Sequence, residues 1–400
     1  MQTKLTPLIQ KRPDGAEIDR ILRSCVHCGF CNATCPTYNI LGDELDGPRG
    51  RIYLLKQLFE GGRVTQATQL HLDRCLTCRA CETTCPSGVQ YGRLLDIGRG
   101  EVERLVPRSM RAKGVRFLML SILPYRWRFK VLFSMAQRLR FLAPRFLRKK
   151  IPVVSSHSDR WPTFKHKRQV LLLEGCVQPS LAPTINLKVA TLLDKLAITP
   201  LKIKHEGCCG ALSQHLAAHR QSTDFIKHNI DQWWPYVEAG IEAIVSTASG
   251  CGVMVKDYGE MMQYDVNYAE KARRIAALTC DISELLLTEQ LPRSRYEKGV
   301  TVAFHNPCTL QHGQKVVNAV ETILQRQGYQ LLAIEGAQDC CGSAGVYSFL
   351  QPDISERLLA DKIFSLEQGK PAVIVTANVG CQTHLQSAST VPVTHWIDLL

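Results

Sequence analysis

Apolar and polar residues follow two different patterns along this 400-residue chain. Between residues 51 and 59 the apolar positions recur every three or four residues, which is the spacing of one helix face, and Gly61-Gly62 then ends the helix. A second short helix is expected at 93–105. From about residue 168 onward, short continuous apolar runs take over, and such runs are typical of buried parallel strands. The chain is therefore predicted to be helical first and α/β afterwards.

The strand-like runs of the second part occur twice. The run at 169–173 is repeated at 302–305, and the run at 243–248 is repeated at 372–377. A cysteine follows each run, and a Cys-Cys-Gly triplet lies between the two runs of each unit. The matching cysteines lie 132, 132, 132 and 130 residues apart: Cys176 and Cys308, Cys208 and Cys340, Cys209 and Cys341, and Cys251 and Cys381. A fixed offset of this kind indicates internal duplication.

These patterns divide the chain into four segments. Residues 1–104 are predicted to form an α-helical domain and residues 105–166 a basic amphipathic connector. A first α/β repeat is expected at 167–290 and a second at 291–400. The predicted fold class is thus α plus α/β, with the two Cys-Cys-Gly repeats in a pseudo-two-fold relation.

The net charge of +13 is concentrated in the connector. Residues 104–158 contain fourteen Lys and Arg but no Asp or Glu, so this segment contributes +14 and the rest of the chain −1. Pro124 and Pro144 divide it into short helices that mix Arg with Phe, Leu and Trp. Such helices bind anionic membrane surfaces; docking on an acidic partner subunit and plain packing on the core are the alternatives. Nucleic acid is not expected as a partner, because no base-reading or stacking module accompanies the charge.

Membrane insertion is not expected from the hydropathy pattern. No run approaches the roughly 18 apolar residues that a spanning helix needs. The first residues do not resemble a secretory signal, which fits a reducing compartment. We therefore expect a cytoplasmic protein that is peripheral on the cytoplasmic face of the inner membrane.

Two cysteine runs in the helical domain carry the strongest chemical signal. They are Cys25-Val-His-Cys28-Gly-Phe-Cys31-Asn-Ala-Thr-Cys35-Pro36 and Cys75-Leu-Thr-Cys78-Arg-Ala-Cys81-Glu-Thr-Thr-Cys85-Pro86. Bacterial ferredoxins bind two [4Fe–4S] clusters with this spacing, and the fourth cysteine of each run ligates the other cluster. The predicted ligands are Cys25, Cys28, Cys31 and Cys85 for cluster 1, and Cys75, Cys78, Cys81 and Cys35 for cluster 2. Zinc knuckles use two cysteine pairs instead, and a disulfide framework does not suit a long chain in a reducing compartment.

The 39 residues between the runs, Pro36 to Arg74, far exceed the connection in a small two-cluster ferredoxin, so this insert is predicted to be helical. Arg49, Arg51 and Arg79 are candidates to offset the negative charge of the clusters. Solvated surface positions are the alternative for all three.

The cysteines of the repeats are predicted to meet at one edge of each sheet. Sites in open α/β sheets form where strands end, and each of these cysteines follows a strand. The candidate metal ligands are Cys176, Cys208, Cys209, Cys251, Cys308, Cys340, Cys341 and Cys381. Four thiols per repeat suit a further iron–sulfur cluster, zinc or a redox dithiol, and small hydrophobic residues at a repeat interface are the alternative. Cys280 lies outside the repeat pattern and is interpreted as a core thiol.

Taken together, these motifs resemble the iron–sulfur subunit of glycolate oxidase over nearly the whole chain. The stretches Leu41-Gly-Asp-Glu-Leu-Asp-Gly-Pro-Arg-Gly-Arg51, Thr247-Ala-Ser-Gly-Cys-Gly252 and Thr376-Ala-Asn-Val-Gly-Cys-Gln-Thr-His384 sharpen the match. The general plan is shared with lactate-utilisation proteins and with the iron–sulfur subunits of heterodisulfide reductase and anaerobic glycerol-3-phosphate dehydrogenase.

The resemblance implies an electron-transfer subunit of an oxidoreductase complex. An FAD-containing partner subunit would oxidise glycolate, or D-lactate, to the 2-oxo acid, and electrons would pass through two [4Fe–4S] clusters towards the membrane quinone pool. No Gly-x-Gly-x-x-Gly follows a strand here, so the flavin is expected on the partner. No catalytic residue is assigned to this chain.

Two positions depart from the heterodisulfide reductase pattern. Where each Cys-Cys-Gly unit of that enzyme ends in Cys-x-x-Cys, this chain has Met254 in the first unit and His384 in the second. The fused cluster of that enzyme is therefore not expected. His384 and His305 are interpreted as structural histidines with hydrogen-bond partners, with proton donation to an acceptor as the alternative.

Three functions of different class remain open from the sequence. The first is the electron-transfer subunit just described, or its equivalent for lactate or glycerol 3-phosphate. The second is a self-contained disulfide or quinone reductase of the heterodisulfide reductase type. The third is a scaffold whose repeats bind structural metal.

Overall fold

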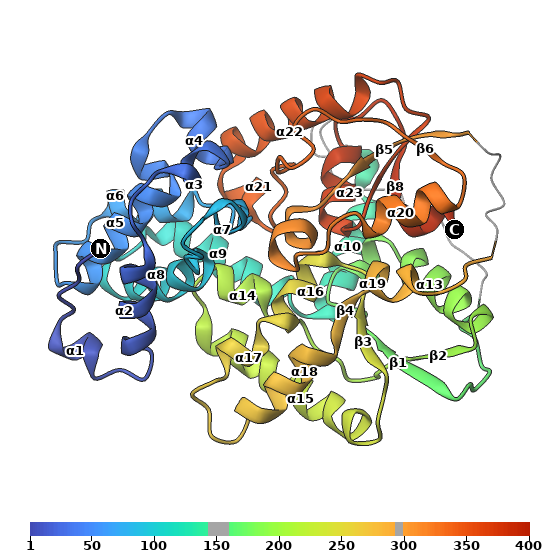
Figure 1. Ribbon diagram of the computed structural model, residues 1–400, viewed down its shortest axis with the longest axis horizontal. Coiled ribbons are helices and arrows are strands. Elements are labelled where there is room, and N and C mark those ends of the chain that lie inside the picture. The colour runs from blue at the N-terminus through green and yellow to red at the C-terminus, as the bar shows by residue number, and fades with distance from the viewer. Residues whose placement is uncertain (143–159, 293–298) are drawn as a thin grey trace.

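The computed structural model describes residues 1–142, 160–292 and 299–400 (Figure 1). The described elements form a helical N-terminal domain, a helical connector and two repeats that each contain a parallel sheet. The predicted fold class is thus confirmed. Within the described residues, no helix combines the length and the apolar character that a membrane crossing requires. The basic residues from 145 to 150 and Pro144 fall outside the described residues.

The N-terminal domain is built from short helices around one apolar core that includes Ile18, Leu55 and Leu94. Its elements are α1 (Pro7–Gln10), α2 (Gly15–Ser24), α3 (Phe30–Ala33), α4 (Pro36–Leu41), η1 (Glu44–Asp46), α5 (Pro48–Phe59), α6 (Gln66–Asp73), α7 (Ala80–Thr84) and α8 (Tyr91–Leu105). The insert between the cysteine runs is helical, as predicted. Helix α8 begins at Tyr91, two residues before the predicted start.

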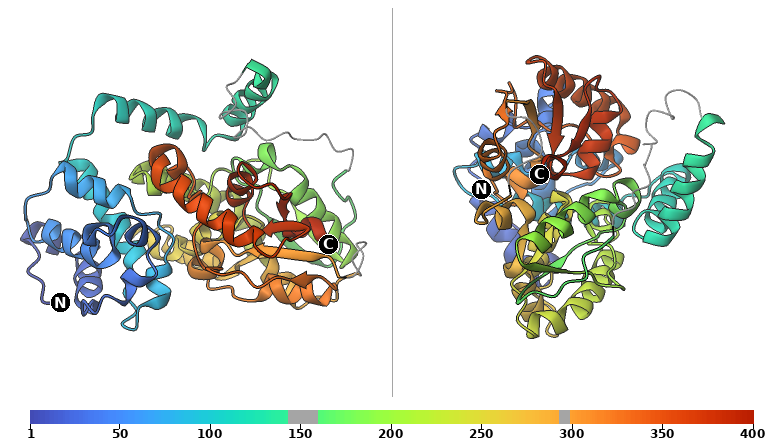
Figure 2. Two further views of the ribbon diagram at one scale, coloured as in Figure 1. Left: turned by 90° about the horizontal axis from the view of Figure 1, so that it is seen from above. Right: turned by 90° about the vertical axis from the view of Figure 1, so that its right-hand side faces the viewer.

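The connector helices lie along the outside of the molecule, as Figure 2 shows. They are α9 (Met110–Ile122), α10 (Arg126–Arg138) and the short η2 (Arg140–Leu142), and neither α9 nor α10 has a buried residue. The break between α9 and α10 falls at Pro124, as predicted, because proline has no backbone N–H to continue the helical hydrogen bonds.

The first repeat contains a four-stranded parallel sheet in the order β2-β1-β3-β4. Its elements are β1 (Arg168–Leu172), α12 (Gln178–Leu181), α13 (Thr184–Lys195), β2 (Ile198–Leu201), α14 (Ala211–His215), α15 (His219–Glu238), β3 (Ala243–Ser246), α16 (Ser249–Lys256), α17 (Tyr258–Met261), α18 (Ala269–Leu278), β4 (Thr279–Asp281) and α19 (Ile282–Leu287). Most strand residues are buried, as in parallel sheets that are covered by helices.

The second repeat has the same topology, in the order β6-β5-β7-β8. Its elements are β5 (Thr301–His305), η3 (Thr309–Gly313), α20 (Ala319–Arg326), β6 (Gln330–Leu331), α21 (Tyr347–Leu350), α22 (Pro352–Glu367), β7 (Val373–Thr376), α23 (Val379–Gln386), β8 (Val393–His395) and η4 (Trp396–Leu399). The strand registers also match: Leu172 pairs with Val245 in the first sheet, and Phe304 pairs with Val375 in the second.

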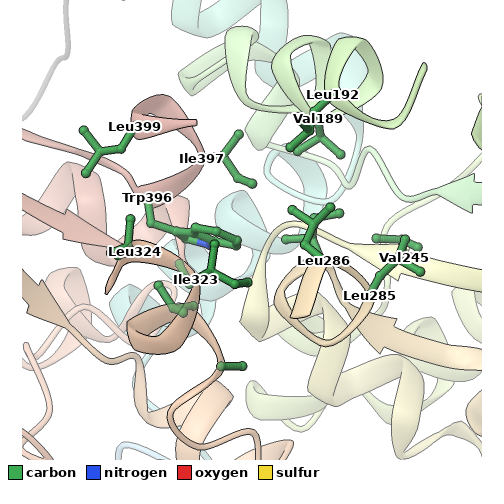
Figure 3. Packing of buried hydrophobic residues seen from close by; sticks show 14 of the residues in the cluster. Val189, Leu192, Val245, Leu285, Leu286, Ile323, Leu324, Trp396, Ile397 and Leu399 are labelled. Atoms are coloured by element: carbon green, nitrogen blue, oxygen red, sulfur yellow. The ribbon is translucent and has the colours of Figure 1, made fainter. Parts of the chain in front are cut away.

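The two repeats share one hydrophobic core, shown in Figure 3. Trp396 and Ile397 from the second repeat face Leu192 and Leu286 from the first. Polar contacts also cross the interface, including a hydrogen bond of 2.7 Å between the hydroxyls of Ser249 and Thr309. The repeats are therefore packed as one body, with their cysteine loops held in fixed positions.

Candidate metal centres

The cysteines predicted for cluster 1 lie around one cavity. Cys25, Cys28, Cys31 and Cys85 all line it, although Cys85 lies 54 residues beyond Cys31 in the sequence. The three-plus-one arrangement expected from the spacing is the arrangement that the fold produces. Burial raises the pKa of Cys31 to about 11, so this thiol keeps its proton until a cation replaces it.

The cysteines predicted for cluster 2 line a second cavity. Cys35, Cys75, Cys78 and Cys81 contribute to it, and burial raises the pKa of the Cys78 and Cys81 thiols above the usual range. Eight thiols in two sets of four, each closed around its own space, are the donor sets that [4Fe–4S] clusters require. Both donor sets therefore fit the predicted cofactors.

The two cavities are direct neighbours. Cys81 and Tyr91 line both of them, so a single layer of side chains separates the two sets of thiols. Tyr91 also donates a hydrogen bond from its hydroxyl to the Cys75 sulfur at 3.5 Å. This tyrosine was not among the predicted site residues, because nothing in the local spacing distinguishes it from a core aromatic residue.

The two cysteine runs adopt the same turn. In each run, the residue before the second cysteine and the residue after it both have positive φ. In the first run Gly29 takes this conformation at φ 86°, where a glycine is not strained. In the second run Arg79 takes it at φ 61°. Such a conformation costs an ordinary residue about 1 kcal/mol or more, and the Arg79 guanidinium is held by two hydrogen bonds to the Asp257 carboxylate, at 3.2 and 2.6 Å. The helical domain is thereby anchored to the first repeat.

Buried arginines surround cluster 2. Arg51 is fully buried; its guanidinium lies 4.0 Å from the Cys35 sulfur and 3.5 Å from the Asp46 carboxylate. Arg99 donates hydrogen bonds of 2.7 Å to the carbonyl groups of Leu72 and Cys75. The alternative of a solvated surface position is wrong for Arg51, and Arg99 was missed because its role depends on contacts more than 20 residues away in sequence.

Arg49 and Arg79 serve different purposes from Arg51. Arg49 forms an ion pair with Glu44 at 2.6 Å and lies over Gly29 of the first cysteine run. Its side chain is 36% exposed, so it is a partly solvated charge beside cluster 1. Arg79 is committed to the Asp257 ion pair.

The structure brings the four cysteines of the second repeat together. Cys308 follows β5, Cys340 and Cys341 lie in the loop after β6, and Cys381 lies in α23. Successive thiols lie close enough to interact, in the order Cys308, Cys340, Cys341 and Cys381. The loops thus converge at the carboxyl edge of the sheet, as expected from the topology.

The first repeat builds the same chain of thiols in different surroundings. The Cys208 thiol lies close enough to interact with those of Cys176 and Cys209, and the Cys209 thiol with that of Cys251. Leu173 and Met254 pack against these cysteines in one hydrophobic cluster. On the outer side, Arg126 of α10 binds the Glu174 carboxylate at 2.7 Å. The connector therefore closes over this site.

The second-repeat cysteines lie beside cluster 2. Cys78 and Cys308 pack against the same small cluster of buried residues, which contains Cys340 and Tyr347. The Tyr347 hydroxyl donates a hydrogen bond of 2.7 Å to the Arg74 carbonyl, immediately before Cys75. Residues far apart in sequence thus join two cysteine sites that the sequence showed only as separate motifs.

The two histidines of the second repeat have different environments. His384 contacts the Ser355 hydroxyl through Nε2 at 3.2 Å, as expected of a structural histidine. His305 is 1% exposed, and neither of its ring nitrogens has a hydrogen-bond partner among the described residues. The expectation that His305 is a hydrogen-bonded structural histidine is therefore wrong. Cys280 is partly buried against the shared core, and burial raises its pKa to about 12, in keeping with a core thiol.

Comparisons with known proteins agree with these sites. A 4Fe-4S dicluster domain model matches residues 21–89, and a cysteine-rich domain model matches 170–256 and 302–386. The glycolate oxidase iron-sulfur subunit of Escherichia coli K12 is 50% identical over 400 residues, which is 100% of this chain and 98% of that protein. The "Probable glycolate oxidase iron-sulfur subunit" of Bacillus subtilis 168 is 27% identical over 90% of this chain and 87% of its own length. Lactate utilization protein A of Halalkalibacterium halodurans is 22% identical over 53% of this chain and 86% of its own length.

Proposed function

This chain belongs to the family of glycolate oxidase iron–sulfur subunits, and we propose that it is the electron-transfer subunit of a glycolate-oxidising complex. Identity of 50% over the full chain favours this function over a self-contained reductase or a scaffold. Substrate oxidation takes place on a partner subunit that carries FAD. The electrons then leave through this chain towards a membrane quinone.

The observation that carries the proposal is the pair of adjacent cavities. Each is lined by the four cysteines predicted for its cluster, and Cys81 and Tyr91 belong to the walls of both. A [4Fe–4S] cluster accepts one electron at a time, so two neighbouring clusters can take the electron pair that a flavin releases singly. Residues Cys25, Cys28, Cys31 and Cys85 would hold one cluster, and Cys35, Cys75, Cys78 and Cys81 the other.

The chain supplies the electrostatic setting for this charge transfer. Arg51 and Arg99 place two buried cations beside the cluster 2 cysteines, and the Tyr91 hydroxyl donates to the Cys75 sulfur. Cations and hydrogen bonds to sulfur stabilise the reduced, more negative state of a cluster. We therefore expect cluster 2 to be the stronger electron acceptor of the two.

The substitution Cys78→Ser tests this function directly. It removes one ligand of cluster 2, so the anaerobically purified chain should fall from about eight cluster irons towards four. Glycolate-dependent quinone reduction by membranes with the reassembled complex should fall at least tenfold. Cys280→Ser is the matched control, because Cys280 lies in β4 away from either cavity, and it should leave both quantities unchanged. Full quinone reduction by the Cys78→Ser complex would contradict the proposal.

The connector supports a membrane-facing orientation on the cytoplasmic side of the inner membrane. Arg108, Arg116 and Arg126 turn towards the body and pair with Asp73 and Glu174. The same helices also expose large apolar residues, among them Phe117, which is 72% exposed, and Trp127, which is 66% exposed. Exposed aromatic residues within a strongly basic segment match the chemistry of an anionic lipid surface.

Co-sedimentation with vesicles tests the membrane contact. The chain should bind vesicles of anionic lipid and not vesicles of neutral phosphatidylcholine, and the double variant Phe117→Ser, Trp127→Ser should bind the anionic vesicles at least fivefold less. Phe364→Ser is the control, since Phe364 is equally exposed, at 69%, but lies on α22 outside the connector. Equal binding by all three proteins would remove the connector from the membrane contact.

A further inference from the structure

Two equivalent positions in the repeats carry different chemistry. His305 ends β5 and pairs with Thr376 of β7. The equivalent position in the first repeat, 132 residues earlier, is Leu173. Its backbone N–H donates a hydrogen bond to the carbonyl of Val245 in β3. Duplication has thus left an imidazole in one repeat where the other has an aliphatic side chain.

His305 points into the cysteine site of its own repeat. One ring nitrogen of His305 and the sulfur atoms of Cys341 and Cys381 all lie within 4.8 Å of one another, and all three residues are buried. Ligand atoms around a tetrahedral metal with nitrogen and sulfur ligands lie about 3.3–3.8 Å apart. Small side-chain rotations are therefore enough to bring the three atoms onto one ion.

An imidazole in this position needs a partner. A buried polar atom without a hydrogen bond costs free energy, and buried polar groups in folded proteins are almost always satisfied. Among the described residues, neither ring nitrogen of His305 has a hydrogen-bond partner. The other group of potential ligands, Asp43, Asp46 and His71, differs in this respect, because Arg51 and Arg74 already pair with Asp46.

We propose that His305, Cys341 and Cys381 bind a transition metal of the iron or zinc class, and that the first repeat has no equivalent nitrogen ligand. These three residues supply one nitrogen ligand and two sulfur ligands. Thiolate and imidazole ligands in a buried tetrahedral arrangement select iron or zinc over magnesium or calcium. This site goes beyond the proposed function, since the eight ferredoxin-type cysteines account for both clusters without it.

The electrostatics of the second repeat favour such a centre. Lys362 is 2% exposed, and its ammonium group donates hydrogen bonds to the carbonyls of Gly336 and Ala337 at 2.8 and 3.0 Å. Its charge attracts the nearby thiolates of Cys340, Cys341 and Cys381. In the first repeat Asn229, a neutral residue, bonds to the corresponding loop at Gly207 and Cys208. The second repeat thus places a buried cation near its thiols where the first repeat has a neutral amide.

The decisive variant is His305→Leu, which gives the second repeat the residue of the first and nearly preserves the side-chain volume. His384→Met is the matched control, because it also replaces a second-repeat histidine by its first-repeat counterpart. His305→Cys is a rescue variant that restores a metal ligand. All three are made in the full chain, which is purified anaerobically and analysed for iron and zinc.

The wild-type chain should contain metal beyond the eight irons of its two clusters. His305→Leu should retain less than a tenth of this additional metal and keep all eight irons, whereas His384→Met and His305→Cys should retain it. If the metal is zinc, its X-ray absorption spectrum should show imidazole scattering that His305→Leu loses. If it is iron, its electron paramagnetic resonance spectrum should show a nitrogen hyperfine coupling. This coupling should change when the histidines are labelled with ¹⁵N, and His305→Leu should lack it.

Two results would overturn the proposal. One is a wild-type chain with eight irons and no additional metal, and the other is His305→Leu with an unchanged metal content and spectrum. Neither result touches the electron-transfer function, which depends on the eight irons and is tested separately by Cys78→Ser. The two proposals therefore fail separately.

Discussion

The two repeats have the same sheet order, the same strand register and the same four cysteines, yet they surround those cysteines differently. In the first repeat, Leu173 and Met254 pack against the thiols, and the connector closes the site through Arg126. In the second, His305 and the charge of Lys362 accompany the thiols, and cluster 2 of the helical domain lies next to them. A duplicated backbone thus preserves where cysteines meet, while single positions nearby decide what chemistry they can support.

The neighbours of each repeat explain this divergence. The second repeat contacts the helical domain through the hydrogen bonds of Tyr347 and Thr83, the latter to His312 at 3.0 Å. The first repeat contacts it through the ion pair between Arg79 and Asp257 and through hydrogen bonds from Gln263 and Tyr264 to Glu17, and its cysteine loop faces the connector. One cysteine site is therefore joined to the electron-transfer domain, and the other to the segment proposed to meet the membrane.

The largest expected effect distinguishes the shared core from the core of a single repeat. Trp396 is fully buried between the repeats, whereas Trp233 is stacked on Tyr258 within the first repeat, with ring centroids 6.1 Å apart. Replacing either by alanine should lower the free energy of unfolding by about 3–5 kcal/mol. Hydrogen exchange should rise in both repeats for Trp396→Ala, but chiefly in the first repeat for Trp233→Ala. If Trp396→Ala accelerated hydrogen exchange in the second repeat alone, the two repeats would be shown to be independently stable.

A pH experiment tests the equivalence of the repeats at one capping position. Asp281 and His395 each end the last strand of their sheet and cap the helix that follows. Burial raises the pKa of Asp281 to about 6 and lowers the pKa of His395 to about 4.

The two shifts have opposite effects on stability. Between about pH 4 and 6 the folded chain keeps a proton on Asp281 that the unfolded chain has lost, so stability falls as pH rises. Over about pH 4 to 6.5 the unfolded chain protonates His395 and the folded chain does not, so stability rises with pH. Each contribution is about 3 kcal/mol at most, and together they should nearly cancel.

The variants Asp281→Asn and His395→Asn should separate the two opposing dependences of stability on pH. Denaturant unfolding at pH 4 to 6.5 should show stability rising more steeply with pH in Asp281→Asn than in the wild-type chain, and falling with pH in His395→Asn. Asparagine retains a capping side chain at each position. Identical slopes in both variants would show that the two positions are not electrostatic counterparts.

The sequence predicted those features that depend on local spacing or on exact repetition. The cysteine runs predicted two sets of thiols because residues three apart in a tight turn can face one cluster, and the 130–132-residue offsets predicted two like sheets. The contacts of Tyr91, Arg99 and Lys362 were beyond such reasoning, because each depends on a partner brought near by the tertiary fold. His305 was misinterpreted for the same reason: its lack of a hydrogen-bond partner is visible only once its neighbours are in place.

The connector illustrates the same limit with charge. Its sequence shows fourteen cations and no local acid, which predicts basic amphipathic helices but not which cations meet carboxylates from other segments. In the fold, several of these cations find carboxylates from other segments, such as Asp73 and Glu174. Other cations, such as Arg111 and Lys130, stay exposed together with Phe117 and Trp127, so the expected membrane contact remains electrostatic and apolar together.

The smallest expected effect concerns Arg126, which joins the connector to the first repeat alone. Its guanidinium donates hydrogen bonds to the Glu174 carboxylate at 2.7 Å and to the Gly175 carbonyl at 3.1 Å, next to Cys176. Because the arginine is partly solvated, Arg126→Ala should lower the free energy of unfolding by only about 1 kcal/mol or less. Limited proteolysis should nevertheless cut the connector faster, and alkylation of Cys176 in the metal-free chain should accelerate, while Cys308 reacts at its original rate. Equal acceleration at Cys308 would mean that the connector shields both repeats, and that their contrast lies in the residues around the thiols rather than in what covers them.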